Sequence, residues 1–374
     1  MIDTRPARGG RPGRAAVAAE AVKACNWLSR VLGRGSGTVA GGRVGLALDR
    51  ELLLTLAAGR PVALVSGTNG KTTTTRLLAA ALTDRNGRLV VSNHTGANMP
   101  AGHVAAMVGS PREAPAVLEV DEGYLGRVMA DTRPWVVVLL NLSRDQLDRI
   151  SEVRMLAERW REALGASAGA EAGVRPPVVV ANADDPLVAY AASAAPSACW
   201  VGAGQVWRND AVGCPACGGR IVFGDGDGDG DADGGGWACE QCGFSRPPCD
   251  AWVEGSVLAL ADGSRYSLDI GLPGQFNRSN AAMAAVAATR AEGDGTDAPG
   301  WGRALPRALE LVAGVREVAG RFSSAIRRGR AVRLLLAKNP AGWAAIFDLL
   351  EENGPTCAPV VRSVNARIAD GLDT

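Results

Sequence analysis

The sequence is poor in lysine, in histidine and in long hydrophobic runs. Three of its 374 residues are lysines and two are histidines, although lysine and arginine together number 40. Because 39 acidic residues leave a net charge of +1, composition gives no reason to expect a nucleic acid or an anionic membrane as the partner. No apolar stretch has the length of a membrane span, and the arginine-rich start lacks the apolar core of a secretion signal. We therefore expect a cytoplasmic protein.

The most informative segment is 66–74, with the sequence SGTNGKTTT. It follows the apolar run 61–65 and precedes a run with helical spacing, so strand, glycine loop and helix occur in that order. The backbone N–H groups of such a loop bind phosphate, its lysine reaches the terminal phosphates, and a hydroxyl holds Mg²⁺. The chain uses arginine for almost every other basic residue, so the lysine at position 71 indicates that a compact ammonium is required there. The alternative is a plain glycine turn before a helix.

Alternating apolar runs and helical patterns from residue 61 to 291 predict a doubly wound α/β nucleotide-binding domain. The expected strands are 62–66, 88–92, 115–120, 135–140 and 177–181, and the expected helices are 71–84, 151–165 and 185–194. We assign residues 1–53 to an N-terminal extension with a disordered start, a helix over 15–32 and a glycine loop; 54–295 to the central domain; and 301–374 to a smaller C-terminal α/β domain. A hairpin over 252–260, helices over 302–312 and 342–351, a strand over 333–337 and a further βα unit from 360 complete the prediction.

Four of the eight cysteines form two CxxC pairs: Cys214, Cys217, Cys239 and Cys242. In a cytosolic chain this spacing is typical of a structural zinc site, because four thiolates close the tetrahedral sphere. We expect a zinc ribbon over 205–249 that interrupts the central domain, with Cys249 near enough to be an alternative ligand. An Asp-Gly repeat starts at Asp225, inside this insertion. It lacks the closing glutamate of a calcium loop, so we expect a flexible tip.

The glycine loop departs from the GxxxxGK[ST] pattern, since Val65 stands where that pattern has its first glycine. The sequence GTNGKTTT instead resembles the shortened phosphate loop of the Mur ligase superfamily. Further matching segments follow in order: LEVDE at 118–122, NLSRDQLDR at 141–149, NADDP at 182–186 and GQFNRSNA at 274–281. The segment LLAKNPAGW at 335–343, together with the four-cysteine ribbon, narrows the resemblance to the ligase-like subunits of lipid II isoglutaminyl synthase, from about residue 30 to the end.

This resemblance implies a role for each matching residue. The nucleotide would be bound by Gly67, Thr68, Asn69, Gly70, Lys71, Thr72 and Thr73 of the loop, and by Asn277, Asn280 and Arg321. Thr72 and Glu119 would hold Mg²⁺, with Glu122 in reserve for Glu119, so Lys71 and Glu119 are the expected catalytic residues. Gln146 replaces a histidine that often binds a second Mg²⁺ in the family, which leaves a second metal open.

The implied reaction is ATP-dependent amidation of the α-carboxylate of D-glutamate in lipid II, giving D-isoglutamine through an acyl phosphate. The resemblance also implies that ammonia comes from a GatD-type glutaminase partner. In this chain itself, His94, His103 and the cysteines form no obvious glutaminase site. Asp370, or else Asp373, would orient the partner's catalytic histidine; the alternative is a turn aspartate. The protein would reach the inner face of the membrane only through its substrate. Family members usually continue past Thr374, which predicts a truncated C-terminus.

Two other functions stay open at this point. One is an amino-acid-adding ligase of the muramyl-peptide or folylpolyglutamate type, although several of those enzymes use a carbamylated lysine and none lies between Lys71 and Lys338. The other is a zinc-ribbon nucleic-acid binder or a nucleotide-gated switch, which the balanced charge and the few aromatic residues near the ribbon disfavour.

Overall fold

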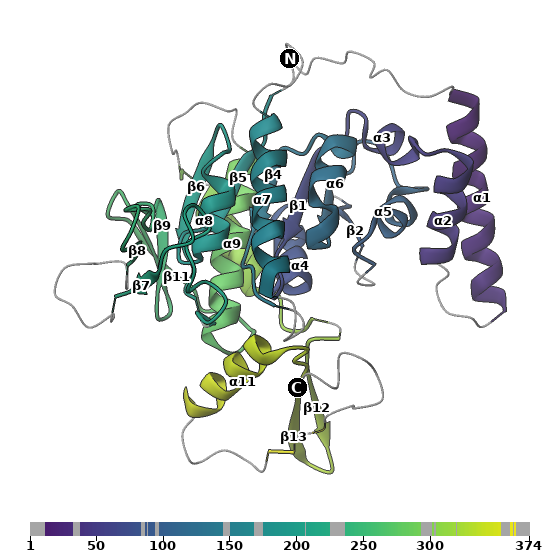
Figure 1. The fold of residues 1–374 in the computed structure, drawn as a ribbon. Coiled ribbons are helices and arrows are strands. Elements are labelled where there is room, and N and C mark those ends of the chain that lie inside the picture. The colour runs from purple at the N-terminus through teal and green to yellow at the C-terminus, as the bar shows by residue number, and fades with distance from the viewer. Residues whose placement is uncertain are drawn as a thin grey trace.

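The computed structural model describes residues 12–32, 38–83, 87, 89–93, 97–144, 150–167, 175–205, 207–224, 236–292, 301–302, 304–318, 320–352, 360–361 and 363. A nine-stranded sheet forms its centre (Figure 1). Its strands are β1 (Val62–Ser66), β2 (Val91–Ser92), β3 (Ala116–Glu119), β4 (Val136–Leu139), β5 (Val178–Asn182), β6 (Ala198–Gly202), β9 (Ala251–Glu254), β10 (Val257–Leu260) and β11 (Arg265–Ser267). They lie in the order β11-β10-β9-β6-β5-β4-β1-β3-β2.

Seven strands, β1 to β6 and β9, are parallel, and β10 and β11 extend the sheet beyond β9 as an antiparallel meander. Strand β1 shows why the sheet is covered on both faces. Ala63 and Val65 belong to one hydrophobic core and Val62 and Leu64 to the other, because successive side chains of a strand point to opposite faces. Both faces of this strand are buried, so its sequence is a continuous apolar run rather than an alternation of apolar and polar residues.

Two layers of helices supply those cores. One face is covered by α4 (Lys71–Ala81), α9 (Gln275–Glu292) and α10 (Ala304–Ala313). The other face is covered by α3 (Leu52–Ala57), α5 (Pro100–Met107), α6 (Leu125–Thr132), α7 (Ile150–Ala166) and α8 (Pro186–Ala192). Every residue of α9 from 281 to 288 is buried, so this helix runs through the interior between the sheet, α4 and α10. Its small alanine side chains allow that close approach.

The predicted sheet is confirmed, and so is the order of strands and helices through the central domain. All five expected strands are present, although β2 is shorter than expected, and α4, α7 and α8 lie where their patterns placed them. Two helices that the sequence did not predict lie between α1 (Pro12–Val31) and β1: α2 (Thr38–Leu48) and α3. The glycine loop expected before them, over 33–38, lies outside the described residues except for Thr38. Strand β6 was not expected either.

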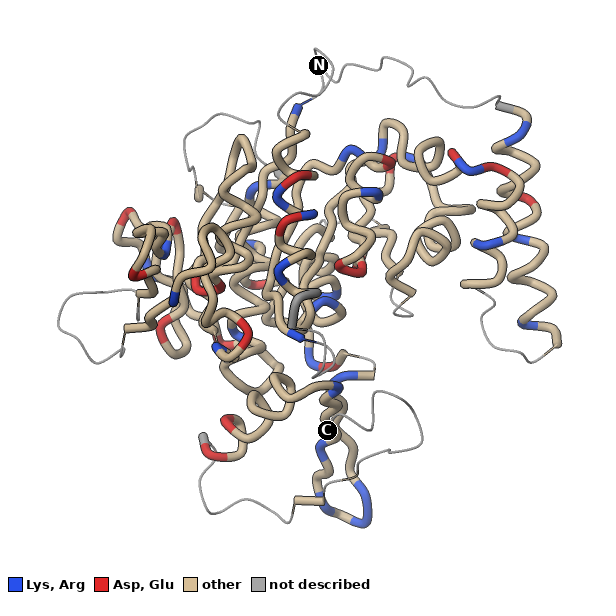
Figure 2. The backbone as a smooth tube through the Cα atoms, in the orientation of Figure 1, with Lys and Arg blue, Asp and Glu red and all other residues tan. Residues whose placement is uncertain are grey.

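The insertion and the C-terminal segment each contain a small antiparallel hairpin. In the insertion, β7 (Ile221–Phe223) pairs with β8 (Trp237–Cys239). In the C-terminal segment, β12 (Phe322–Arg327) pairs with β13 (Arg330–Leu335), and α11 (Pro340–Glu352) follows. The tip of this second hairpin carries Arg327, Arg328 and Arg330, the blue end of the loop below the C label in Figure 2. The Asp-Gly repeat and most of the βα unit expected from residue 360 lie outside the described residues.

No helix in the described part of the chain is both long enough and apolar enough to cross a lipid bilayer.

Candidate functional site

The loop between β1 and α4 is held tightly at both of its glycines. Gly67 has φ 142° and Gly70 has φ 86°, backbone angles that residues other than glycine rarely adopt. A Cβ at Gly70 would lie 2.5 Å from Oδ1 of Asn280, and a Cβ at Gly67 would lie 2.9 Å from Cβ of Leu140. The loop therefore packs directly on α9 and on the end of β4, which fixes where α4 begins.

Asn141, directly beyond β4, braces the same loop. Its Oδ1 accepts a hydrogen bond from the Asn69 N–H at 2.9 Å, and its Nδ2 donates to the Asn69 carbonyl at 3.0 Å. Thr68 is bound in the same way, since its N–H donates to the Asn141 carbonyl and its hydroxyl donates to the Ser143 carbonyl. The side chain of Thr68 is thus engaged in holding the loop. The N–H groups of the first turn of α4, which have no carbonyl one turn back, are left for an anion.

A cavity of about 590 Å³ opens beside this loop. Its walls include the expected nucleotide-site residues Thr68, Asn69, Gly70, Lys71, Thr72, Thr73, Asn277, Asn280 and Arg321, together with Glu119. The C-terminal segment closes one side, with Lys338 and Asn339 also in the wall. Nη2 of Arg321 lies 3.4 Å from the hydroxyl of Thr72, and both residues line this cavity. Residues 249 positions apart in the chain thus meet at one site.

Lys71 is oriented by three acceptors. Its Nζ donates to the carbonyl of Gly67 at 2.5 Å and of Thr68 at 3.1 Å, and it lies 3.1 Å from Oε2 of Glu122. Burial raises the pKa of Glu122, and the Lys71 charge works against that shift. The carboxylate paired with Lys71 is therefore Glu122, whereas Glu119 remains in the cavity wall. This arrangement leaves Glu119 available as a metal ligand.

The backbone of Glu119 is held by two buried side chains that the motif analysis did not single out. Asn93 accepts from the Glu119 N–H and donates to the Glu119 carbonyl, both at 2.8 Å. Nε2 of His103 lies 2.8 Å from the same carbonyl. Burial lowers the pKa of His103 to about 4, so at neutral pH the ring is uncharged and donates through Nε2. The sequence contains a sign of this role for Asn93, because this polar residue directly follows the end of an expected strand.

The two aspartates of the NADDP segment hold structure around the cavity. Asp185 is fully buried and accepts from the N–H groups of Leu142, Leu187 and Val188, so it caps α8 and ties that helix to the end of β4. Burial raises its pKa to about 6, against those hydrogen bonds. Asp184 forms an ion pair with Arg246 of the insertion, with 2.6 Å between Oδ1 and Nε. The segment thus joins three parts of the fold.

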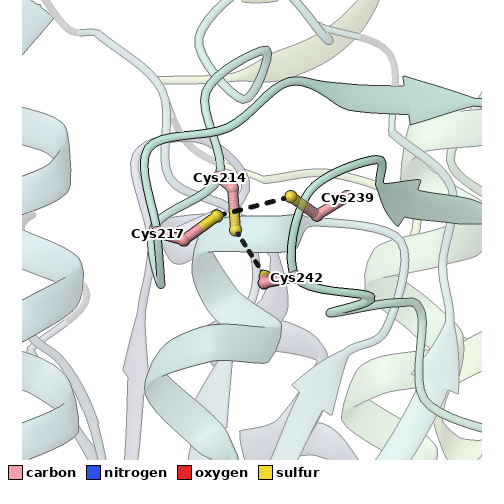
Figure 3. Close-up of side chains that lie close together, drawn as sticks. All are labelled: Cys214, Cys217, Cys239 and Cys242. Carbon is pink, nitrogen blue, oxygen red and sulfur yellow. Dashed lines mark hydrogen bonds between the residues drawn. The ribbon is translucent and has the colours of Figure 1, made fainter.

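The four cysteines of the CxxC pairs converge at one end of the β7–β8 hairpin (Figure 3). Their sulfur atoms all lie within 4.8 Å of one another; Cys214 and Cys242 are 3.7 Å apart, and Cys217 and Cys239 are 3.6 Å apart. Sulfurs bound to zinc at about 2.3 Å in a tetrahedron stand about 3.8 Å apart, so the set has the right size for Zn²⁺. Backbone N–H groups of Gly219 and Gln241 point at sulfur, which stabilises thiolates.

Cys249 is not part of this cluster; its thiol instead approaches the Pro247 carbonyl. The insertion is fixed to the central domain through other groups. The indole of Trp237 donates to the Ala183 carbonyl at 3.0 Å, and Arg144 pairs with Asp210 at 2.5 Å. The cysteine cluster therefore stands beside the sheet rather than in the cavity, as a structural site would.

Two expected features lie outside the described residues: Asp370 with its alternative Asp373, and Gln146 at the position of a second metal ligand. The histidine His94 lies outside them as well.

Known proteins resemble this chain over the central domain and beyond it. A family model for the Mur ligase middle domain matches residues 65–205. The chain is 30% identical over 369 residues to a Streptococcus pneumoniae protein named lipid II isoglutaminyl synthase (glutamine-hydrolyzing) subunit MurT, covering 93% of this chain and 76% of that protein. A Staphylococcus aureus protein of the same name is 28% identical over 359 residues, which cover 92% of this chain and 76% of the relative.

A solved structure shares the architecture. The pseudomurein peptide ligase type C of Methanothermus fervidus matches with a TM-score of 0.57 and 25% identity, over 80% of this chain and 58% of that one. The chain thus spans less than two thirds of that ligase's length. The likeness establishes a Mur ligase-like α/β fold with a large, mainly parallel sheet.

Replacing Asn93 by alanine should destabilise the protein, because it removes both hydrogen bonds to the Glu119 backbone in a buried place. We expect Asn93→Ala to lower the free energy of unfolding by about 2–4 kcal/mol in urea denaturation at pH 7.5. Asn69→Ala is the matched control: the Asn69 side chain makes only a 3.5 Å contact with Ser143, so little change is expected. Equal stability of the two variants would contradict the bracing role of Asn93.

The purified chain should retain zinc in proportion to protein. Cys217→Ser removes one thiolate of the cluster, so it should lower the zinc content and reduce Tm by about 5 °C or more. Cys249→Ser, which removes a neighbouring cysteine outside the cluster, should leave both unchanged. Metal analysis and thermal unfolding check this; loss of zinc in Cys249→Ser would show that the ligand set is wrong.

Proposed function

The chain belongs to the MurT family of lipid II isoglutaminyl synthase subunits, and it is a ligase. We propose that it amidates the α-carboxylate of D-glutamate in lipid II to D-isoglutamine, at the expense of ATP and with ammonia delivered by a GatD-type glutaminase. The observation that carries this proposal is the convergence of Lys71, Glu119 and Arg321 on one cavity beside a phosphate loop. That cavity offers what carboxylate activation needs: an anion cradle, cations and a carboxylate ligand.

The residues present suit ATP and Mg²⁺. The first-turn N–H groups of α4, the Lys71 ammonium and the Arg321 guanidinium are donors for phosphate oxygens. The hydroxyl of Thr72 and the carboxylate of Glu119 are hard oxygen donors of the kind that Mg²⁺ prefers. When bound, Mg²⁺ would neutralise part of the negative charge of the phosphates. Asn277 and Asn280 line the same cavity and are the proposed contacts to the rest of the nucleotide.

A carboxylate reacts with ammonia only after one of its oxygens has become a leaving group. In the proposed reaction a carboxylate oxygen of D-glutamate attacks the γ-phosphorus of ATP, and ADP leaves. Ammonia then adds to the carbonyl carbon of the acyl phosphate, and phosphate departs with the former carboxylate oxygen while the nitrogen loses a proton. Most of the catalysis in such a site is positioning and electrostatic stabilisation.

Lys71 is oriented for this role by groups of the protein itself. Two carbonyls and Glu122 hold its ammonium at the mouth of the loop, and its side chain is 12% exposed. Little reorganisation is then needed to present the charge to a phosphate, which is the advantage of a preorganised site. Asn93 and His103 serve the same purpose for Glu119, because they fix the backbone from which that carboxylate extends.

The nitrogen source is the second part of the proposal. The relatives are named as one subunit of a glutamine-hydrolysing enzyme, which implies a partner subunit. We propose that the partner contains the cysteine and histidine that release ammonia, and that Asp370 of this chain completes that site. This chain's own His103 is buried against Glu119 and unavailable for such chemistry.

Reconstitution tests the proposal. The chain is mixed with a GatD-type glutaminase, detergent-solubilised lipid II, ATP, Mg²⁺ and glutamine, and the product is analysed by mass spectrometry for exchange of OH for NH₂. Lys71→Ala should reduce kcat by about 10²–10³-fold, as loss of one charge-stabilising donor does. Lys23→Ala, a lysine on α1 far from the cavity in sequence and fold, should have normal activity.

Glu119→Gln and Glu122→Gln separate the two carboxylates. Glu119→Gln should raise the Mg²⁺ concentration needed for activity, whereas Glu122→Gln, which frees Lys71, should leave that requirement nearly unchanged. Incorporation of a free amino acid in place of ammonia would make the chain an amino-acid-adding ligase instead. Full amidation by Lys71→Ala would exclude the proposed role of the loop.

A further inference from the structure

Helices α1 and α2 form a hairpin at the edge of the molecule, beyond α5 (Figure 1). Ala15, Ala18 and Val22 of α1 are buried, and α2 packs between α1 and α5. Helix α2 packs closely against α5, because a Cβ added to Gly42 would overlap the carbonyl of Ala101. The hairpin is therefore firmly attached to the rest of the fold. The side chains on its outer face are held in a fixed orientation relative to the central domain.

That outer face is apolar. Eight of the twenty exposed large hydrophobic side chains in the described part of the chain lie on this short hairpin or directly at the end of α1: Val17, Trp27, Leu28, Val31, Leu32, Val39, Val44 and Leu48. On α1, Val17, Leu28 and Val31 recur at helical spacing on the side opposite the buried alanines. A surface helix ordinarily has a mainly polar outer face, so this number of exposed large apolar side chains indicates a second apolar environment.

The same hairpin is basic. Its described residues, 12–32 and 38–48, contain Arg14, Lys23, Arg30 and Arg43 against the single acid Glu20, a net charge of +3 in a chain whose total is +1 (Figure 2). Glu20 is paired with Lys23 at 2.7 Å, which leaves the arginines to set the sign of the field. Exposed valine, leucine and tryptophan flanked by arginine and lysine are the composition of a helix that lies in a membrane interface.

We propose that the outer face of the α1–α2 hairpin docks this protein on an anionic phospholipid surface. Trp27, Leu28 and Val31 would enter the boundary between headgroups and acyl chains, and Arg30 and Arg43 would face the headgroup phosphates. The inference rests on the proposed function, because a lipid-linked substrate is what makes such docking useful. Docking would hold the cavity close to the membrane in which the lipid-linked substrate diffuses, and so raise the effective concentration of that substrate.

A lipid surface fits these observations better than a protein partner does. Arginine is common in protein interfaces, but a protein partner would have to supply matching acidic groups for the net positive charge of this hairpin. An anionic bilayer supplies both the negative charge and the apolar interior. Each cation near an anionic bilayer strengthens binding, and the effect declines with salt over a Debye length. Salt dependence together with a requirement for anionic lipid is therefore the expected signature.

Cosedimentation with vesicles tests the proposal. The full chain is centrifuged with vesicles of phosphatidylglycerol and phosphatidylcholine, and with vesicles of phosphatidylcholine alone, without lipid II, ATP or the partner. Binding to the anionic vesicles, weakened by salt, is the expected result. Combined Trp27→Ser, Leu28→Ser and Val31→Ser substitutions should reduce binding by about tenfold or more. Arg30→Glu with Arg43→Glu should reduce it by at least about fivefold per charge.

Trp135→Ser is the matched control, because Trp135 is 50% exposed, close to the 60% of Trp27, but precedes β4. It should bind vesicles as the unsubstituted chain does, and circular dichroism verifies that all variants fold. Absence of binding to anionic vesicles would overturn the proposal, and so would equal loss in Trp135→Ser. If the triple substitution instead dissociates a dimer without altering vesicle binding, the face is a protein interface and the proposal fails.

The outcome is separable from that of the amidation assay. The triple-substituted protein should retain amidation of detergent-solubilised lipid II, because none of its changed residues lies in the cavity. Failure of vesicle binding with intact amidation rejects only the docking surface, whereas vesicle binding without amidation rejects only the proposed reaction.

Discussion

Two hydrogen bonds between the side chain of Asn141 and the backbone of Asn69 hold the phosphate loop against the end of β4, and the site depends on that attachment. With the loop in place, Gly70 can lie against Asn280 and α4 can begin at Lys71. The first turn of α4 then lines the cavity together with the side chains of Lys71 and Arg321. Neighbouring parallel strands bring Glu119 to the same edge, because β3 lies next to β1 and both end there.

The charged side chains around this cavity are paired or hydrogen-bonded through short, buried contacts. Glu122 neutralises Lys71, Asp184 neutralises Arg246, and Asp185 is stabilised by backbone N–H groups. Each of these charges is costly to bury alone, so pairing and hydrogen bonding make the arrangement tolerable while fixing its geometry. A net charge near zero conceals this local order, and it also conceals the basic hairpin at the edge of the fold.

The sequence was sufficient to predict the parallel sheet and the glycine loop, since valine-rich runs and the GTNGKTTT segment depend on local pattern. Helix α2 could not be predicted in that way, because glycines 41, 42 and 45 argue against a helix. In the structure those glycines are where α2 contacts its neighbours, so tertiary packing offsets their low propensity. The pairing of Lys71 with Glu122 joins residues 51 positions apart, which depends on the completed sheet rather than on local pattern.

The central claim is that this cavity activates a carboxylate by phosphorylation, and oxygen labelling tests it most directly. Lipid II with ¹⁸O in the α-carboxylate of D-glutamate is converted with ATP, Mg²⁺, glutamine and the glutaminase partner, and the released phosphate is analysed by mass spectrometry. The account predicts that ¹⁸O from the carboxylate appears in inorganic phosphate in proportion to the amide formed. Amide formation with unlabelled phosphate would contradict it.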